Sequence, residues 1–119
     1  MSSVSSESTD WLADVLRATT VEMVRSDGPD LTARQLAVFL ICYLEPEAQT
    51  VRGLAQRLDV SKPAITRALD RLTEFDLIAR KPDPSDRRSV LAQRTTEGNA
   101  YLREIRSLLR GAASGKRGR

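Results

Sequence analysis

The hydrophobic positions repeat at helical spacing along most of the chain. Apolar residues three or four apart predict helices over residues 11–26, 51–58 and 96–112. Residues 36–44 are apolar almost all round, so we expect the helix that contains them to be covered on most sides. A further amphipathic helix runs from Ser61 to about Phe75. The residues on its inward face are Ile65, Ala68, Leu69 and Leu72.

Polar residues that cap helices mark where these segments begin. Thr32 with Gln35 fits a capping box, in which the side chain of each residue accepts a hydrogen bond from the backbone N–H of the other. A side-chain oxygen just before a helix accepts a hydrogen bond from a first-turn N–H. The other caps that we expect are Asp10, Thr50, Ser61 and Thr95.

Two short strands are predicted between the last two helices, at residues 77–81 and 88–93. The segment between them, residues 82–87, holds two prolines and no apolar residue, which predicts an exposed hairpin tip. The expected fold class is therefore mainly α with a small β-hairpin, that is, α+β.

Charge is distributed unevenly over the 119 residues. Residues 1–50 carry three Arg against eight acids, a net −5. Residues 51–94 carry ten Lys or Arg against six acids, and residues 95–119 carry six against two, a net +4 in each. An acidic first part and a basic remainder indicate that one face of the molecule meets a polyanion.

The composition excludes several kinds of site. The chain has no His and one Cys, Cys42, so we expect neither a His/Cys zinc site nor an internal disulfide. No catalytic constellation, metal site or cofactor motif can be assembled, and we predict that the protein is not an enzyme. Neither a signal peptide nor a run of ~20 apolar residues is present, which predicts a cytoplasmic protein without a membrane partner.

Residues 51–75 match the requirements of a helix-turn-helix. Ala55 is small where the two helices cross, Val60 is the apolar turn residue, and Ile65 anchors the second helix. The outward face of that second helix would reach base edges in the major groove of double-stranded DNA. Its predicted DNA-binding residues are Lys62, Thr66, Arg67 and Arg71. The alternative is an ordinary solvated helix face.

The hairpin tip adds a second predicted DNA contact. Arg87 and Arg88 follow Asp83-Pro84-Ser85-Asp86, and an extended arginine fits a narrow minor groove. Asp86 is expected to hold a neighbouring guanidinium in place. Residues at helix N-termini are expected to bind phosphates without reading sequence. These phosphate-binding candidates are Thr50, Arg52 and Ser61.

The region from Thr50 to Gly98 resembles the DNA-binding part of the MarR family of bacterial transcription regulators. The motifs are LAQRL-x-VSKPAITRALDRL, then DPSDRR, then TTEG; upstream, the LT and RQLAVFL of LTARQLAVFL also fit. The resemblance implies a winged helix-turn-helix homodimer that binds a pseudo-palindromic operator. It also implies a repressor, or in some members an activator, that is often released by a small phenolic or other lipophilic anion bound between the dimerisation and DNA-binding parts. It places Lys62, Pro63, Thr66 and Arg67 on the base-reading segment, and Asp86 with Arg88 as the acid–arginine pair of the wing tip.

The chain departs from that family's pattern at three places. Asp76 stands where the family usually has Gly, and we expect Asp76 to adopt the left-handed conformation. Gln93-Arg94 stands where the family often has an apolar residue. Many relatives continue into a further helix beyond the one at 96–112, and this bears on the size of the dimer interface and of the ligand pocket.

The expected organisation is a single domain. It consists of a disordered leader at 1–9, a winged domain at 10–113 with its DNA-binding unit at about 31–94 and dimerisation helices at about 11–26 and 96–112, and a flexible basic tail at 114–119.

Two alternatives for function remain open. The first is a winged-helix protein-interaction module without specific DNA binding, although such a module does not need paired arginines in its wing. The second is a DNA-binding protein without an effector.

Cys42 is expected to be a buried, inert thiol rather than a redox sensor. Trp11 and Tyr101 are expected to pack at an interface rather than to line a ligand pocket.

Overall fold

The computed structural model describes residues 6–117. They form, in chain order, α1 (Ser6–Arg25), α2 (Ala33–Leu44), β1 (Gln49–Thr50), α3 (Val51–Leu58), α4 (Lys62–Glu74), β2 (Ile78–Asp83), β3 (Asp86–Arg94) and α5 (Thr96–Arg117). The chain divides into two compact units, named here for their places in the sequence. The central unit is Leu31–Tyr101, and the terminal unit is formed by the residues up to Asp30 and from Leu102 onward.

The helices of the central unit begin where the caps were predicted. Thr32 Oγ1 accepts from Gln35 N at 3.1 Å, and Gln35 Oε1 accepts from Thr32 N at 3.0 Å, which completes the capping box. Thr50 Oγ1 accepts from Gly53 N at 3.0 Å and starts α3. Ser61 Oγ plays the same part for α4, and Pro63 lies in the first turn, where it interrupts no intrahelical hydrogen bond.

The core of the central unit is built around Phe39 of α2. Its ring stacks on that of Tyr43 with centroids 4.4 Å apart and meets the edge of Tyr101 at 5.2 Å. The largest side chains that lie fully buried with it are Val38, Leu54, Ile65, Leu69, Leu72 and Ile78. The prediction that α2 is covered on most sides is correct only in part. Its fully buried residues are Val38, Phe39, Cys42 and Tyr43, whereas Leu36, Ala37, Leu40 and Ile41 are half-buried and Leu44 is 54% exposed.

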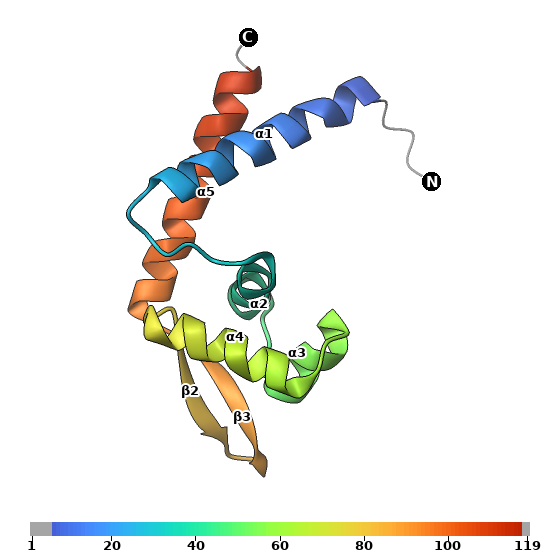
Figure 1. The fold of residues 1–119 in the computed structure, drawn as a ribbon, viewed down its shortest axis with the longest axis vertical. Coiled ribbons are helices and arrows are strands. Elements are labelled where there is room, and N and C mark those ends of the chain that lie inside the picture. Colours follow the sequence, from blue (N-terminus) through green and yellow to red (C-terminus); the bar gives the residue numbers. More distant parts are fainter. Residues whose placement is uncertain (1–5, 118–119) are drawn as a thin grey trace. The chain divides into compact units, whose positions relative to one another are not determined.

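The sheet has one strand more than predicted. Its order is β1-β3-β2, and both pairs are antiparallel. β1 pairs Gln49 with Ala92 and Thr50 with Leu91, a pairing across about forty residues that no local pattern signals. The β2–β3 hairpin projects from the helices of this unit (Figure 1).

The hairpin is longer than predicted and its tip is shorter. Strands were expected at 77–81 and 88–93, whereas β2 and β3 leave only Pro84-Ser85 between them. Asp83 Oδ1 accepts from both the backbone N and the hydroxyl of Ser85, which stabilises this tight turn. Pro82 sits within β2, and the register is irregular next to it.

Two aspartates turn the chain in the left-handed conformation. Asp76 has φ 61°, as predicted for the residue that replaces the usual glycine between α4 and β2. Asp59 has φ 56° and ends α3, where its N–H bonds to Ala55 O and Gln56 O. Aspartate adopts this conformation more readily than most other residues, because its short polar side chain can form local hydrogen bonds.

The terminal unit differs from the sequence prediction at both ends. α1 begins at Ser6, so residues 6–9 are helical rather than a disordered leader, and Asp10 is not its cap. α5 continues to Arg117, so residues 114–117 are helical rather than a flexible tail. Residues 1–5 and 118–119 of those two predicted segments lie outside the described part.

The apolar side chains of α1 are only partly buried. Val15 and Thr19 are buried, whereas Leu12 is 51% and Leu16 is 64% exposed. On α5, Leu102 and Ile105 are buried. The terminal unit therefore leaves large apolar side chains of α1 uncovered within a single chain. None of the helices in residues 6–117 is both long and apolar enough to cross a membrane.

Candidate nucleic-acid interface

Residues 51–74 have the geometry of a helix-turn-helix. α3 and α4 are joined by residues 59–61, and Val60 N donates to Ala55 O at 3.1 Å across the turn. Ala55 is buried at 7% exposure, and Ile65 is completely buried. The small residue, the turn residue and the anchor expected from the sequence therefore occupy those roles.

The faces of α4 are divided as its periodicity predicted. Its buried residues are Ala64, Ile65, Ala68, Leu69 and Leu72. The candidate DNA-binding side chains of the first two turns are all exposed: Lys62, Pro63, Thr66 and Arg67. This half of α4 presents three hydrogen-bond donors to solvent: the ammonium of Lys62, the guanidinium of Arg67 and the hydroxyl of Thr66.

Arg71, the fourth predicted base-reading side chain, is held by its own helix. Its Nη1 lies 2.8 Å from Glu74 Oε1, and its guanidinium stacks 4.6 Å from the centre of the Phe75 ring. Both partners lie toward the C-terminal end of α4. A DNA contact by Arg71 would first have to break this ion pair.

The wing carries its arginines as predicted but positions its acid differently. Arg87 and Arg88 are exposed at the start of β3. Asp86 was expected to hold a guanidinium, but its Oδ1 accepts from the backbone N of Arg88 at 3.0 Å. No ion pair within residues 6–117 includes Asp86, since the carboxylate is used to shape the turn.

The phosphate-binding candidates lie at the N-termini of α3 and α4. Arg52 and Ser61 are exposed, and Thr50 is partly so. The hydroxyls of Thr50 and Ser61 accept the capping hydrogen bonds, yet each hydroxyl keeps one hydrogen to donate. Capping and phosphate binding are therefore compatible at both residues.

An ion pair that was not predicted from the sequence joins α4 to β2. Arg80 Nη1 of β2 lies 2.6 Å from Asp70 Oδ1 of α4. The exposed Lys81 on the same strand was not singled out either. Arg80 and Lys81 fell within a strand predicted at residues 77–81. Only the packing of that strand against α4 shows that Asp70 and Arg80 meet.

A buried hydroxyl organises the base of the wing. Tyr43 Oη donates to Leu77 O at 2.6 Å and accepts from Thr95 N at 2.9 Å. Thr95 Oγ1 donates to Asp76 O and accepts from Gly98 N, so it caps α5 as predicted. The end of α2, the turn after α4 and the start of α5 are thus tied together.

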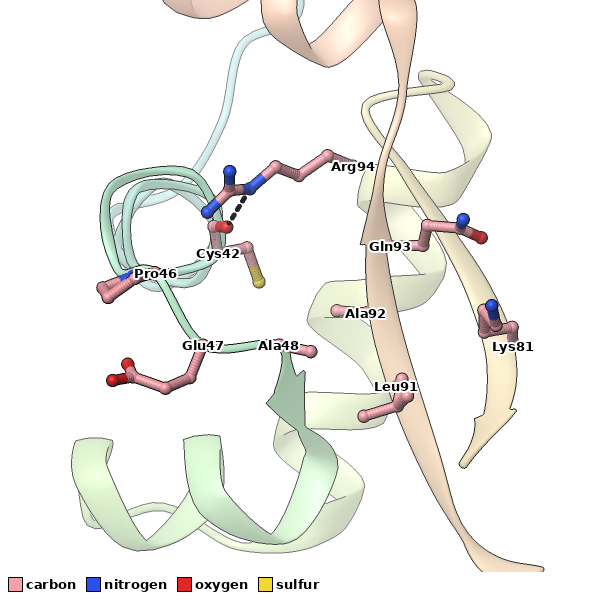
Figure 2. A pocket seen from close by; sticks show the side chains of 9 residues that line it. All are labelled: Cys42, Pro46, Glu47, Ala48, Lys81, Leu91, Ala92, Gln93 and Arg94. Atoms are coloured by element: carbon pink, nitrogen blue, oxygen red, sulfur yellow. Dashed lines mark hydrogen bonds between the residues drawn. The ribbon is translucent and has the colours of Figure 1, made fainter. Parts of the chain in front are cut away.

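Arg94 lies just before Thr95, where the resemblance led us to expect an apolar residue, and its side chain has a structural role here. Its Nε donates to Cys42 O at 2.8 Å and its Nη2 to Glu45 O at 2.6 Å, so it caps the C-terminal end of α2. Figure 2 shows the guanidinium reaching across from β3. The partners are 49 to 52 residues apart, so no local signal could have predicted this contact.

Cys42 is buried at 4% exposure, as expected. Burial raises the pKa of its thiol to about 11, and the nearby positive charge of Arg94 opposes this only in part. Since the thiolate is the reactive form, this cysteine is a poor nucleophile at neutral pH.

The model of the MarR family matches residues 31–90, half of the chain. The chain belongs to the MarR family. It is 37% identical over 81 residues to the multiple antibiotic resistance protein MarR of Escherichia coli (strain K12). That alignment covers 67% of this chain and 55% of MarR. The chain therefore spans little more than half the length of this curated relative.

Solved structures of the MarR family share the winged-helix fold. A crystal structure of MarR is 30% identical, with a TM-score of 0.66 and coverage of 89% of this chain and 77% of that one. CouR from Rhodococcus jostii RHA1, crystallised with p-coumaroyl-CoA, is 26% identical, with a TM-score of 0.64 and coverage of 89% and 72%.

Proposed function

We propose that the chain is a sequence-specific double-stranded DNA-binding regulator of transcription. The observation that carries the proposal is the exposed face of α4, with Lys62, Thr66 and Arg67 in its first two turns. α4 would lie in the major groove, where lysine, arginine and hydroxyl groups read base edges. The buried face of the same helix fixes its rotation, so these donors point in a defined direction.

The wing would supply the second contact. Arg87 and Arg88 follow a two-residue tip, so their Cα positions are restrained while their side chains reach outward. An arginine inserted in a narrow minor groove meets the most negative potential on the duplex. Thr50, Arg52 and Ser61 would bind phosphates on either side and set the register.

We further propose a homodimer that acts as a repressor on a pseudo-palindromic operator. The exposed Leu12 and Leu16 of α1 support a partner, since clustered apolar side chains on a helix face commonly mark an interface. Two-fold symmetry would place the two copies of α4 about 34 Å apart, one turn of the duplex.

Release by a small lipophilic or phenolic ligand is the last part of the proposal. Its support is the likeness to CouR, whose structure contains p-coumaroyl-CoA. A ligand that binds the free form better than the DNA-bound form would shift the equilibrium away from the operator.

The test is a selection of binding sites from a pool of random duplexes. The proposal predicts enrichment of an inverted repeat whose half-sites are about one helical turn apart. Enrichment of a single half-site would contradict the dimer. A pool that stays random, with a folded protein, would contradict specific DNA binding and favour a winged-helix protein-interaction module.

A further inference from the structure

One face of α5, within the terminal unit, carries three arginines. At about 100° per residue, Arg103, Arg106 and Arg110 lie on the same side of the helix as Ser107 and Ser114. All five side chains are exposed. No other residue of the segment 102–115 falls within the same arc of about 100°. These five residues are called here the arginine face of α5.

The positive charge of the arginine face is not compensated within the helix. Arg106 is three residues from Arg103 and four from Arg110, and like charges at these spacings destabilise a helix. The two acids of α5, Glu97 and Glu104, are neither three nor four residues from any of these arginines. Among the side chains that the structure describes, none forms an ion pair with them. An anion from outside the chain would therefore relieve their mutual repulsion.

The kinds of side chain on the arginine face indicate the class of partner. The face combines guanidinium and hydroxyl groups with no apolar residue, whereas the centre of a protein–protein interface is enriched in aromatic and other apolar side chains. Leu102 and Ile105 of the same helix segment are buried elsewhere. Arginine and serine are side chains that bind DNA phosphates, and the guanidinium fork matches the geometry of a phosphate group. The face thus suits a phosphate backbone better than an acidic protein segment.

The length of the arginine face also suits a duplex. Arg103 and Arg110 are seven residues apart, which is about 10 Å along the helix axis. Double-stranded DNA carries one negative charge per roughly 1.7 Å of its axis, so about six phosphates lie within that length. Each of the three guanidinium groups can therefore meet a phosphate of its own.

We propose that the arginine face of α5 binds the phosphate backbone of double-stranded DNA without reading its sequence. It would raise the affinity of the chain for any duplex and hold it on DNA while it slides or hops between sites. This goes beyond the proposed function, because it depends neither on base reading by α4 nor on the wing.

The test is a titration of the full chain with a shuffled duplex at salt concentrations from about 50 to about 200 mM. The α5 variant replaces the three arginines of the face by glutamine, whose helix propensity is close to that of arginine. Each phosphate contact contributes about −0.9 to the slope of log affinity against log salt, so the slope is expected to become shallower by roughly 2 to 3. The affinity at the lowest salt concentration is expected to fall at least about tenfold.

A control variant removes the same charge elsewhere. It replaces three exposed arginines of α1 and α2 by glutamine: Arg17, Arg25 and Arg34. Its salt slope is expected to stay close to that of the wild type. Equal losses in the two variants would reduce the arginine face to general charge attraction, and no loss in the α5 variant, or no binding of any duplex by the wild type, would overturn the proposal as well.

Urea denaturation and sedimentation velocity without DNA separate this role from a structural one. The α5 variant is expected to be at least as stable as the wild type, because it lacks the like-charge pairs, and to sediment as the wild type does. A changed oligomeric state with unchanged affinity for the shuffled duplex would assign the face to a second copy of the chain and overturn the proposal. Replacing the same arginines by lysine keeps the charge, so the salt slope should be retained; its loss in that variant would also contradict phosphate binding.

The same titrations distinguish this proposal from sequence-specific recognition. If the wild type binds its selected duplex and the shuffled duplex equally, while the α5 variant loses affinity for both, specific recognition by α4 fails and the arginine face stands. If the wild type prefers the selected duplex, and the α5 variant binds the shuffled duplex as tightly as the wild type does, the arginine face fails and the proposed function stands.

Discussion

The hydroxyl of Tyr43 fills the space beside Gly98 that a Cβ atom would need. A side chain at residue 98 would overlap Tyr43 Oη and would approach the backbone oxygen of Leu77 to 2.5 Å. The two oxygens are already joined by a hydrogen bond, so neither can move without breaking it. Gly98 is therefore required by packing rather than by backbone conformation, and it lets α5 begin directly against α2.

Gly98→Ala is expected to destabilise the fold by about 1–3 kcal/mol or more, as overpacking of a rigid site does. Gly111→Ala is the matched control on the same helix, because nothing lies within 4 Å of the added methyl group. Alanine loses less backbone entropy than glycine when the chain folds, so the control variant should be as stable as the wild type or more stable by roughly 0.5–1 kcal/mol. Urea denaturation of both variants measures the difference, and equal stabilities would show that the contact with Tyr43 is not restrictive.

Arg88→Ala is expected to weaken binding to the selected duplex by roughly 1–3 kcal/mol, because it removes a side chain that would enter the minor groove. Arg34→Ala is the control: it removes the same charge from an exposed position on α2, outside α4 and the wing. Fluorescence anisotropy at one fixed salt concentration gives both affinities. Identical losses for the two variants would reduce the role of the wing to general charge attraction.

Leu16→Glu is expected to convert the proposed dimer to a monomer while leaving the fold of each chain intact. Leu16 is 64% exposed in the single chain, so a charge there costs little unless a partner covers it. Arg17→Gln changes the net charge by the same amount at the next, exposed residue and should remain dimeric. Sedimentation velocity distinguishes the two states, and a dimeric Leu16→Glu variant would place the interface elsewhere.

The stability of the wild type should fall more steeply in alkali than that of Cys42→Ala. The folded pKa of about 11 lies above the ordinary value of 9.0, so the folded state holds this proton more tightly than the unfolded state does. The resulting stability is fully present below pH 9.0 and is lost as the pH rises toward 11. Denaturation at about pH 8 and about pH 10.5 tests this, and an unchanged difference between the two proteins would contradict it.

The accuracy of the sequence predictions followed the range of the interactions involved. Thr32, Thr50 and Ser61 cap their helices through contacts three residues away, and the starts of α2, α3 and α4 were therefore predictable. Asp76 likewise revealed its turn by its place between a helix and a strand. These are local choices made by short stretches of sequence.

The contacts that the sequence did not predict join residues that are separated in the chain. β1 exists because Gln49 meets Ala92, and the end of α2 is capped by Arg94. The exposed face of α4 was predicted from periodicity. The pairing of Asp70 with Arg80 was not, because opposite charges ten residues apart have no preferred meeting point until the helix and the strand are packed.

The most direct measurement of the central claim is a titration of the wild-type chain against its selected duplex and a shuffled duplex, at about 50 and 200 mM salt. We predict that, at the higher salt concentration, the chain binds the selected duplex at least about a thousandfold more tightly than the shuffled duplex. Both affinities are expected to fall steeply between the two salt concentrations, because phosphate contacts release counterions. Equal affinity for the two duplexes would contradict sequence-specific recognition by α4.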